Sequence, residues 1–274
     1  MTLSDPAFVA RQYGDAANLD ARISLHQRFG AAEEPLPRWI FGQLDGPPDA
    51  RILELGCGPG LLWTENRGRV PDGWSVTLTD ASAGMVREAE GRLGPDHRFR
   101  FLVADAQEIP FRDGTFDAVL ANHMLYHVPD VSRALSEAAR VLRPDGRLYA
   151  ATNGEGDMCE LGPMRHVLDP SHPPDAATKE PPAFSLENGG AQLSRLFSEV
   201  SLRRRGGTLS VTEAEPLLEY LLCGATADAV AGEPAAELSR RISDLAARLG
   251  RELDLHGAIR ITTDPGLFVA RRPR

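Results

Sequence analysis

Residues 52–60, I-L-E-L-G-C-G-P-G, constrain the fold more than any other part of this chain. They read as a short apolar strand with one acid, a turn that contains three glycines, and the start of a helix. Such a turn lets a cofactor lie against bare backbone, because glycine carries no side chain and tolerates positive φ. The stretch therefore predicts an α/β fold that binds a nucleoside or nucleotide.

The spacing of the glycines indicates which kind of ligand the turn suits. A dinucleotide fingerprint needs glycines at positions 56, 58 and 61, and position 61 is Leu. The loop therefore favours a nucleoside without a pyrophosphate. A NAD-dependent oxidoreductase would share the sheet and the acid for the ribose, so it stays open as an alternative that Leu61 disfavours.

Polar residues follow the next three expected strands. Because the carboxyl ends of parallel strands open onto one crevice, we expect these residues to form a single mouth. An acid at the tip of the second strand can accept hydrogen bonds from both ribose hydroxyls, which is the role expected of Asp80. In chain order the tips are Asp80-Ala81 after strand 74–80, Asp105-Ala106 after strand 99–104, and Asn122-His123 after strand 116–121.

The pattern E-L-G-C-G-P-G and the ordered strand tips resemble the class I S-adenosylmethionine (SAM) dependent methyltransferases over about residues 50–152. The resemblance implies SAM as cofactor and S-adenosylhomocysteine as product. It implies a Rossmann-like α/β fold, which we expect as a seven-stranded, mostly parallel sheet with helices on both faces. The last strand is expected to be antiparallel, and a helical cap or lid to cover the open end.

The resemblance also implies roles for single residues. Glu54 and the glycines would hold the amino-acid end of the cofactor, and Asp105 would accept from the adenine amino group while the Ala106 amide meets the ring. Met85 would pack on the adenine face, although its helical spacing also fits simple core packing. The expected cofactor-binding residues are Glu54, Gly56, Gly58, Gly60, Asp80, Ala81, Met85, Asp105, Ala106 and Asn122.

Three residues are candidates for chemistry: His123, His127 and Tyr13. Histidine has an ordinary pKa near 6.5 and can accept a proton at neutral pH. His123, next to the fourth strand tip, is the better candidate, since His127 also fits a packing role. No metal is expected, because no Glu lies between them as in H-E-x-x-H and no third ligand is evident. Tyr13 would close over the sulfonium by cation–π attraction, or simply anchor a helix.

Composition excludes several classes of function. The formal charge of −9 argues against a nucleic-acid substrate, and no apolar run approaches the roughly 18 residues of a membrane span. The N-terminus shows no basic-plus-apolar signal, and the three cysteines have no metal or disulfide spacing. We therefore expect a cytoplasmic protein that acts on a small molecule, with homo-oligomerisation left open.

The order of the patterns suggests four regions: an N-terminal helical lid at 1–50, the SAM-binding core at 51–152, a cap or substrate region at 153–257 interleaved with late core elements, and the final core strand at 258–274. The expected reaction is methyl transfer to carbon, nitrogen or oxygen of a small organic acceptor, such as a secondary metabolite. A non-catalytic SAM-binding partner protein is the remaining alternative.

Overall fold

The computed structural model describes residues 17–172, 181–223 and 234–273, so Tyr13 lies outside the described residues. Its larger lobe is built on a seven-stranded sheet with the strand order β3-β2-β1-β4-β5-β9-β6. The strands are β1 (Arg51–Leu55), β2 (Ser75–Asp80), β3 (Phe99–Val103), β4 (Phe116–Asn122), β5 (Leu142–Asn153), β6 (Phe197–Arg204) and β9 (Pro265–Pro273).

Strands β1 to β5 run parallel to one another, whereas β9 pairs antiparallel with both β5 and β6. The predicted seven-stranded, mostly parallel sheet with an antiparallel last strand is confirmed. The central strand β1 is buried at every position after Arg51, as expected of a parallel strand that is covered on both faces.

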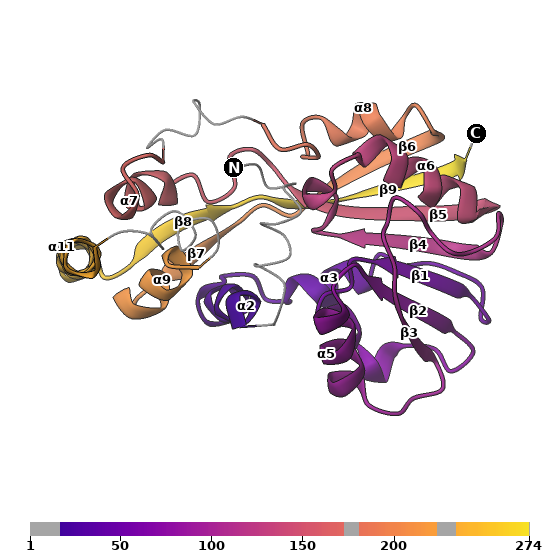
Figure 1. The fold of residues 1–274 in the computed structure, drawn as a ribbon, viewed down its shortest axis with the longest axis horizontal. Coiled ribbons are helices and arrows are strands. Elements are labelled where there is room, and N and C mark those ends of the chain that lie inside the picture. The colour runs from indigo at the N-terminus through magenta and orange to yellow at the C-terminus, as the bar shows by residue number, and fades with distance from the viewer. Residues whose placement is uncertain (1–16, 173–180, 224–233, 274) are drawn as a thin grey trace.

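Helices cover both faces of this sheet (Figure 1). Successive β1 residues point to opposite layers: Ile52 packs in a cluster with Trp63 and Ala89, and Leu53 packs in another with Leu135. The first layer contains α3 (Leu36–Phe41), α4 (Leu61–Thr64) and α5 (Ala83–Leu93), with the 3-10 turn η1 (Arg67–Arg69). The second contains α6 (Val131–Val141), α8 (Gly189–Leu193) and the turn η2 (Leu125–His127).

A second, smaller lobe lies beyond the carboxyl end of β5 and the amino end of β9 (Figure 1). Its antiparallel hairpin pairs β7 (Gly207–Val211) with β8 (Ile259–Thr263). Around the hairpin lie α2 (Ala17–Phe29), α7 (Leu161–Leu168), α9 (Ala214–Leu221) and α11 (Ala235–His256). The buried side chains of these elements form a hydrophobic core of their own.

The N-terminal region does not form one lid. Helix α2 belongs to the second lobe, where Leu25 and Phe29 are buried in the same cluster as Leu217. Helix α3 packs instead on the larger lobe, where Ile40 and Phe41 join the cluster around Trp63. The described part of this region, residues 17–50, is therefore shared between the two lobes, because α2 and α3 bury apolar residues in different cores.

The C-terminal segment 258–274 differs from the expected single core strand. It forms two strands, of which only β9 joins the large sheet, while β8 pairs with β7 in the second lobe. The burial patterns explain the division. Buried and exposed residues alternate along β8, as in a hairpin strand with one covered face, whereas the run from Gly266 to Ala270 in β9 is buried continuously.

One part of the sheet lacks a helical cover. The chain from β3 to β4, residues 104–115, contains no helix, so the β2–β3 end of the sheet is open on the α6 side. Leu102, which faces that side, is accordingly 38% exposed. Within the described residues, no helix is both long and apolar enough to cross a membrane.

Candidate active site at the strand tips

The glycine-rich turn after β1 needs its glycines for conformation and for space. Gly56, Gly58 and Gly60 all have positive φ, at 60°, 52° and 76°. A Cβ on Gly56 would lie 2.7 Å from the Cβ of Met124, which follows the β4 tip, so a side chain there would collide with it. The turn thus brings bare backbone against Met124, directly after the end of β4.

The backbone N–H groups of this turn are largely used inside the protein. The amide of Gly58 donates to Asp80 Oδ2 at 3.0 Å, and that of Gly60 donates to the Cys57 carbonyl at 3.1 Å. Pro59 has no N–H group. A pyrophosphate is normally bound by several free N–H groups at such a turn, so this geometry disfavours a dinucleotide.

Asp80, at the tip of β2, joins the glycine turn to helix α5. Besides the Gly58 amide it accepts the Ser82 amide on Oδ1 at 2.8 Å, and Ser82 in turn caps α5. Burial raises the pKa of Asp80, and the two amide hydrogen bonds oppose that rise. A carboxylate has about four lone-pair sites, so Asp80 retains acceptor capacity for further donors.

Glu54 lies inside the core, where its carboxyl group is 2% exposed and contacts two side chains. Trp63 Nε1 donates to Oε2 at 2.5 Å, and Asn122 Nδ2 donates to Oε1 at 2.9 Å. Burial raises its pKa to about 7, although both hydrogen bonds favour the charged form. Glu54 therefore links β1, α4 and β4, a connection that the sequence did not reveal because nothing marks Trp63 as its partner.

Asn122 and His123, at the tip of β4, present polar atoms without partners. Asn122 Oδ1 and His123 Nε2 are both buried, and neither has a hydrogen-bond partner in the described part of the chain. His123 also has a φ of 52°, a left-handed conformation that costs a non-glycine residue roughly 1–2 kcal/mol. Strained residues of this kind cluster at functional sites.

The electrostatics of His123 differ from the sequence expectation. Burial, with a smaller contribution from His26 on α2, lowers its pKa to about 4, whereas the sequence alone suggested titration near 6.5. The imidazole is therefore neutral at pH 7. His26 reaches this site from the second lobe, and no sequence pattern had marked it.

The other candidates occupy different positions. His127 lies in η2 with its ring centroid 4.5 Å from that of Tyr126, an arrangement consistent with packing. Met85 is fully buried, as expected of a core residue. Asp105 is exposed and accepts from the backbone and side chain of Gln107.

Two remaining strand-tip residues differ in exposure: Ala106 is buried, whereas Ala81 is exposed beside Asp80. No cluster of three metal-ligating side chains occurs among the described residues. The structure thus brings together Glu54, the glycine turn, Asp80, Asn122 and His123 around the carboxyl ends of β1, β2 and β4.

Comparisons with known proteins agree with this arrangement. A family described as "Methyltransferase domain" matches residues 53–150. A malonyl-(acyl-carrier protein) O-methyltransferase of Enterobacter lignolyticus is 32% identical over 220 residues, which cover 78% of this chain and 76% of the relative. A demethylmenaquinone methyltransferase of Beutenbergia cavernae is 41% identical over 42% of this chain and 45% of its own length. The chain spans about half the length of the first curated relatives it matches.

Solved structures share the fold. Phosphoethanolamine N-methyltransferase 2 of Haemonchus contortus superposes with a TM-score of 0.59 at 18% identity, over 100% of this chain and 61% of that one. The 4+2 cyclase SpnF superposes with a TM-score of 0.55 at 20% identity, over 97% and 96% of the two chains. The sheet topology, the glycine turn and the matching relatives lead to one conclusion: the chain belongs to the class I SAM-dependent methyltransferase superfamily.

Proposed function

We propose that this protein transfers the methyl group of SAM to a nucleophile on a small organic acceptor at the carboxyl ends of β1, β2 and β4. The observation that carries the proposal is the conjunction of three left-handed glycines with two buried polar atoms, Asn122 Oδ1 and His123 Nε2, that have no hydrogen-bond partner among the described residues. Buried polar atoms normally have partners, so an unpartnered pair at a strand mouth fits a site that a ligand completes.

The residues present fit SAM as the cofactor. When bound, SAM supplies an electrophilic methyl group on a sulfonium centre. Asp80 has lone pairs left for the ribose hydroxyls, and the glycine turn offers bare backbone without requiring a phosphate. Asn122 Oδ1 is an acceptor suited to an ammonium or hydroxyl donor. We assign Asp105, Ala106 and Ala81 to the binding of the adenosine part of SAM.

The protein would promote the transfer mainly by alignment and by exclusion of water. An in-line displacement gains most from holding the nucleophile close to the methyl carbon. His123 Nε2, neutral at pH 7, is able to accept a hydrogen bond or a proton from the acceptor.

A second candidate acceptor is the carboxyl group of a thioester-bound acyl chain. The observation in its favour is the relative named malonyl-(acyl-carrier protein) O-methyltransferase, of which this chain covers 76%. A quinone-like ring is favoured by the shorter match to a demethylmenaquinone methyltransferase. These acceptors differ in size and in the presence of a carrier protein, so one assay separates them.

The experiment measures S-adenosylhomocysteine formation from SAM with matched acceptors: free phenols and quinols, free dicarboxylic acids, and a malonyl thioester on acyl-carrier protein. Turnover with a free compound supports the small-molecule proposal. Turnover only with the carrier-bound malonyl group selects the second candidate. Tight S-adenosylhomocysteine binding without turnover on any acceptor would point to a non-catalytic SAM-binding protein.

A further inference from the structure

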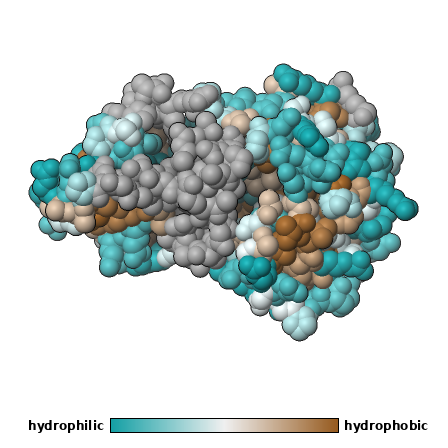
Figure 2. All heavy atoms as spheres, viewed as in Figure 1, coloured by the Kyte–Doolittle hydropathy of each residue, from teal (hydrophilic) through white to brown (hydrophobic). Residues whose placement is uncertain are grey.

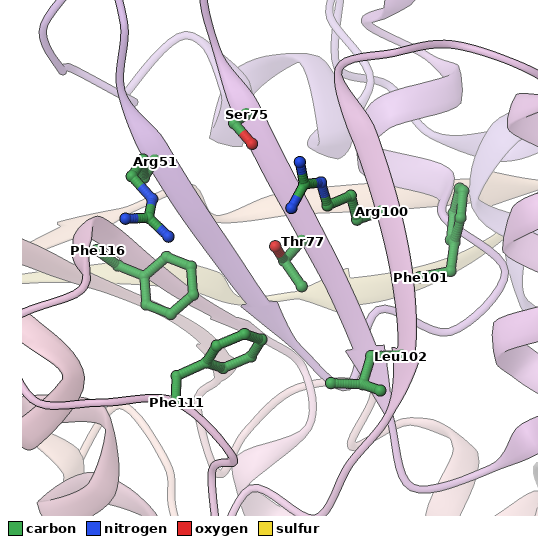
Figure 3. A pocket seen from close by; sticks show the side chains of 8 residues that line it. All are labelled: Arg51, Ser75, Thr77, Arg100, Phe101, Leu102, Phe111 and Phe116. Carbon is green, nitrogen blue, oxygen red and sulfur yellow. The ribbon is translucent and has the colours of Figure 1, made fainter.

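A hollow of about 210 Å³ lies on the uncovered face of the large sheet (Figure 3). Its charged end lies away from the strand mouth, since Ser75 precedes the strand-tip residue Asp80 by five positions, about 16 Å along a strand at ~3.3 Å per residue. Its apolar end reaches Leu102, which lies opposite Thr79. The hollow is lined by Arg51, Ser75, Thr77, Arg100, Phe101, Leu102, Phe111 and Phe116.

The register of the strands places two arginines and two hydroxyls on this face. Arg51 of β1 lies opposite Ser75 of β2, and Arg100 of β3 lies opposite Thr77. Paired residues of parallel strands share a face and lie close together, so the four polar groups form one patch across three strands. Figure 3 shows all four side chains on the near face, whereas Phe101 points away.

Neither arginine has a carboxylate partner among the described residues. The Arg51 guanidinium lies over the ring of Phe116, with 5.9 Å between its central carbon and the ring centroid, while the Arg51 backbone amide donates to Asp117 Oδ2 at 2.8 Å. Several other arginines of the larger lobe form ion pairs, as Arg98 does with Asp96 at 2.7 Å. In a chain of formal charge −9, two guanidinium groups on one sheet face, neither with a carboxylate partner among the described residues, form a local site of opposite charge to the whole.

The other side of the hollow is apolar. Phe111 and Phe116 meet edge to face, with ring centroids 5.0 Å apart, and Leu102 lies beside them with 38% of its surface exposed. An apolar wall beside the guanidinium groups of Arg51 and Arg100 matches a ligand with an anionic head and an apolar body. Guanidinium groups and hydroxyls are suited to bind carboxylate or phosphate oxygens.

We propose that this hollow is a binding site for an amphipathic anion, with the head held by Arg51, Arg100 and the hydroxyls, and a short acyl or aryl body packed on Leu102 and the two phenylalanines. The site is separate from the proposed methyl-transfer site. It therefore stands or fails independently of the proposed function. Either a carboxylate or a phosphate ester would satisfy the same chemistry.

The test is a titration of the full-length protein with octanoate, followed by amide chemical shifts in two-dimensional NMR. Matched probes are octyl phosphate, which exchanges the head, 1-octanol, which lacks the charge, and acetate, which lacks the body. We expect octanoate or octyl phosphate to shift the amides of residues 75–77 and 100–102, and to bind at least about fivefold tighter than 1-octanol. The tighter of the two identifies the head group.

Three variants make the test specific. Arg100→Gln is expected to weaken octanoate about fivefold, and Leu102→Glu to abolish its binding. Arg87→Gln is the matched control, since Arg87 is an exposed arginine on α5, on the other side of the sheet. Equal affinity for octanoate and 1-octanol would overturn the proposal. So would equal losses in Arg100→Gln and Arg87→Gln, or no shift at these amides with any probe.

Discussion

Asn122 Nδ2 donates a hydrogen bond to Glu54 Oε1 at 2.9 Å, and this contact decides which atom Asn122 presents to the strand mouth. With the amide nitrogen held by the carboxyl group, Oδ1 is left buried and finds no partner within residues 17–172, 181–223 and 234–273. The other carboxyl oxygen is held by Trp63 Nε1. The buried acid therefore positions an acceptor at the mouth through a neighbouring amide.

Asn122→Ala removes this acceptor, and we expect S-adenosylhomocysteine affinity to fall about tenfold, since one hydrogen bond to a charged donor contributes roughly 1.5–3 kcal/mol. Calorimetry measures the loss, and circular dichroism verifies the fold. His127→Ala is the control, because His127 packs against Tyr126 and is expected to keep cofactor affinity within about threefold while lowering thermal stability. Unchanged affinity in Asn122→Ala would remove Asn122 from the cofactor site.

Glu54 makes a pH-dependent contribution to stability. Its pKa in the folded protein is raised to about 7, above its ordinary value, so folding favours the protonated form. The contribution of Glu54 to the free energy of unfolding therefore falls as pH rises from about 4.5 through 7, by at most about 3.4 kcal/mol, whereas the lowered pKa of His123 acts in the opposite direction. In Glu54→Gln this decline should be smaller when urea unfolding is compared at pH 5 and pH 8.

Part of the decline will persist in that variant, because burial also raises the pKa of Asp157, to about 6, with the same sign. Asp157→Asn therefore serves as a second variant, expected to remove a separate share of the decline. An identical pH dependence in wild type and Glu54→Gln would contradict the assignment of a raised pKa to Glu54.

His123 should show no titration near neutral pH. Because its pKa is lowered to about 4, the turnover rate should pass through pH 6.5 without an inflection that belongs to this residue. His123→Asn suits a test of its role, since Asn tolerates the left-handed backbone better than most residues. If His123 accepts the proton, the variant should lose about 10²-fold or more in turnover with unchanged S-adenosylhomocysteine affinity. Near-normal turnover would leave alignment and desolvation as the source of catalysis.

Much of the larger lobe could be predicted from sequence, because its signals are local. Each signal spans about a dozen residues or fewer. The signals are the apolar strand with its glycine turn, each later strand with the polar residue at its tip, and the apolar period of α6. The partners of Glu54 could not be predicted in this way. Asn122 lies 68 positions from it, and the contact depends on β1 and β4 being neighbours in the sheet.

The second lobe was harder to predict for a related reason. Its core combines α2 near the N-terminus with β7, α9 and β8 from the last third of the chain. The apolar residues Leu25 and Phe29 of α2 lie four positions apart and indicate a buried side, but they do not show which core buries it. The alternation along β8, against the continuous apolar run of β9, was a readable signal that 258–274 contains two different strands.

Leu25→Ala tests whether α2 is an integral part of the second lobe. Leu25 is fully buried in the cluster that includes Leu217 and Leu249, so its truncation should cost about 2–5 kcal/mol of stability. Leu255→Ala is the control: Leu255 lies in the same lobe but is 74% exposed, so its truncation should change stability by less than about 0.5 kcal/mol. Urea unfolding measures both, and equal effects would show that α2 does not depend on this core.

The central claim is that the strand mouth binds the adenosyl cofactor of a methyltransferase, and an S-adenosylhomocysteine titration tests it most directly. Wild-type protein should bind S-adenosylhomocysteine with one-to-one stoichiometry in calorimetry and give no signal with NAD. Asp80→Ala should weaken binding more than tenfold, since hydrogen bonds to a charged group contribute roughly 1.5–3 kcal/mol each. Asp145→Ala, at an exposed position of β5, should leave it unchanged. Binding of NAD in place of S-adenosylhomocysteine, or an unchanged titration in folded Asp80→Ala, would contradict the account.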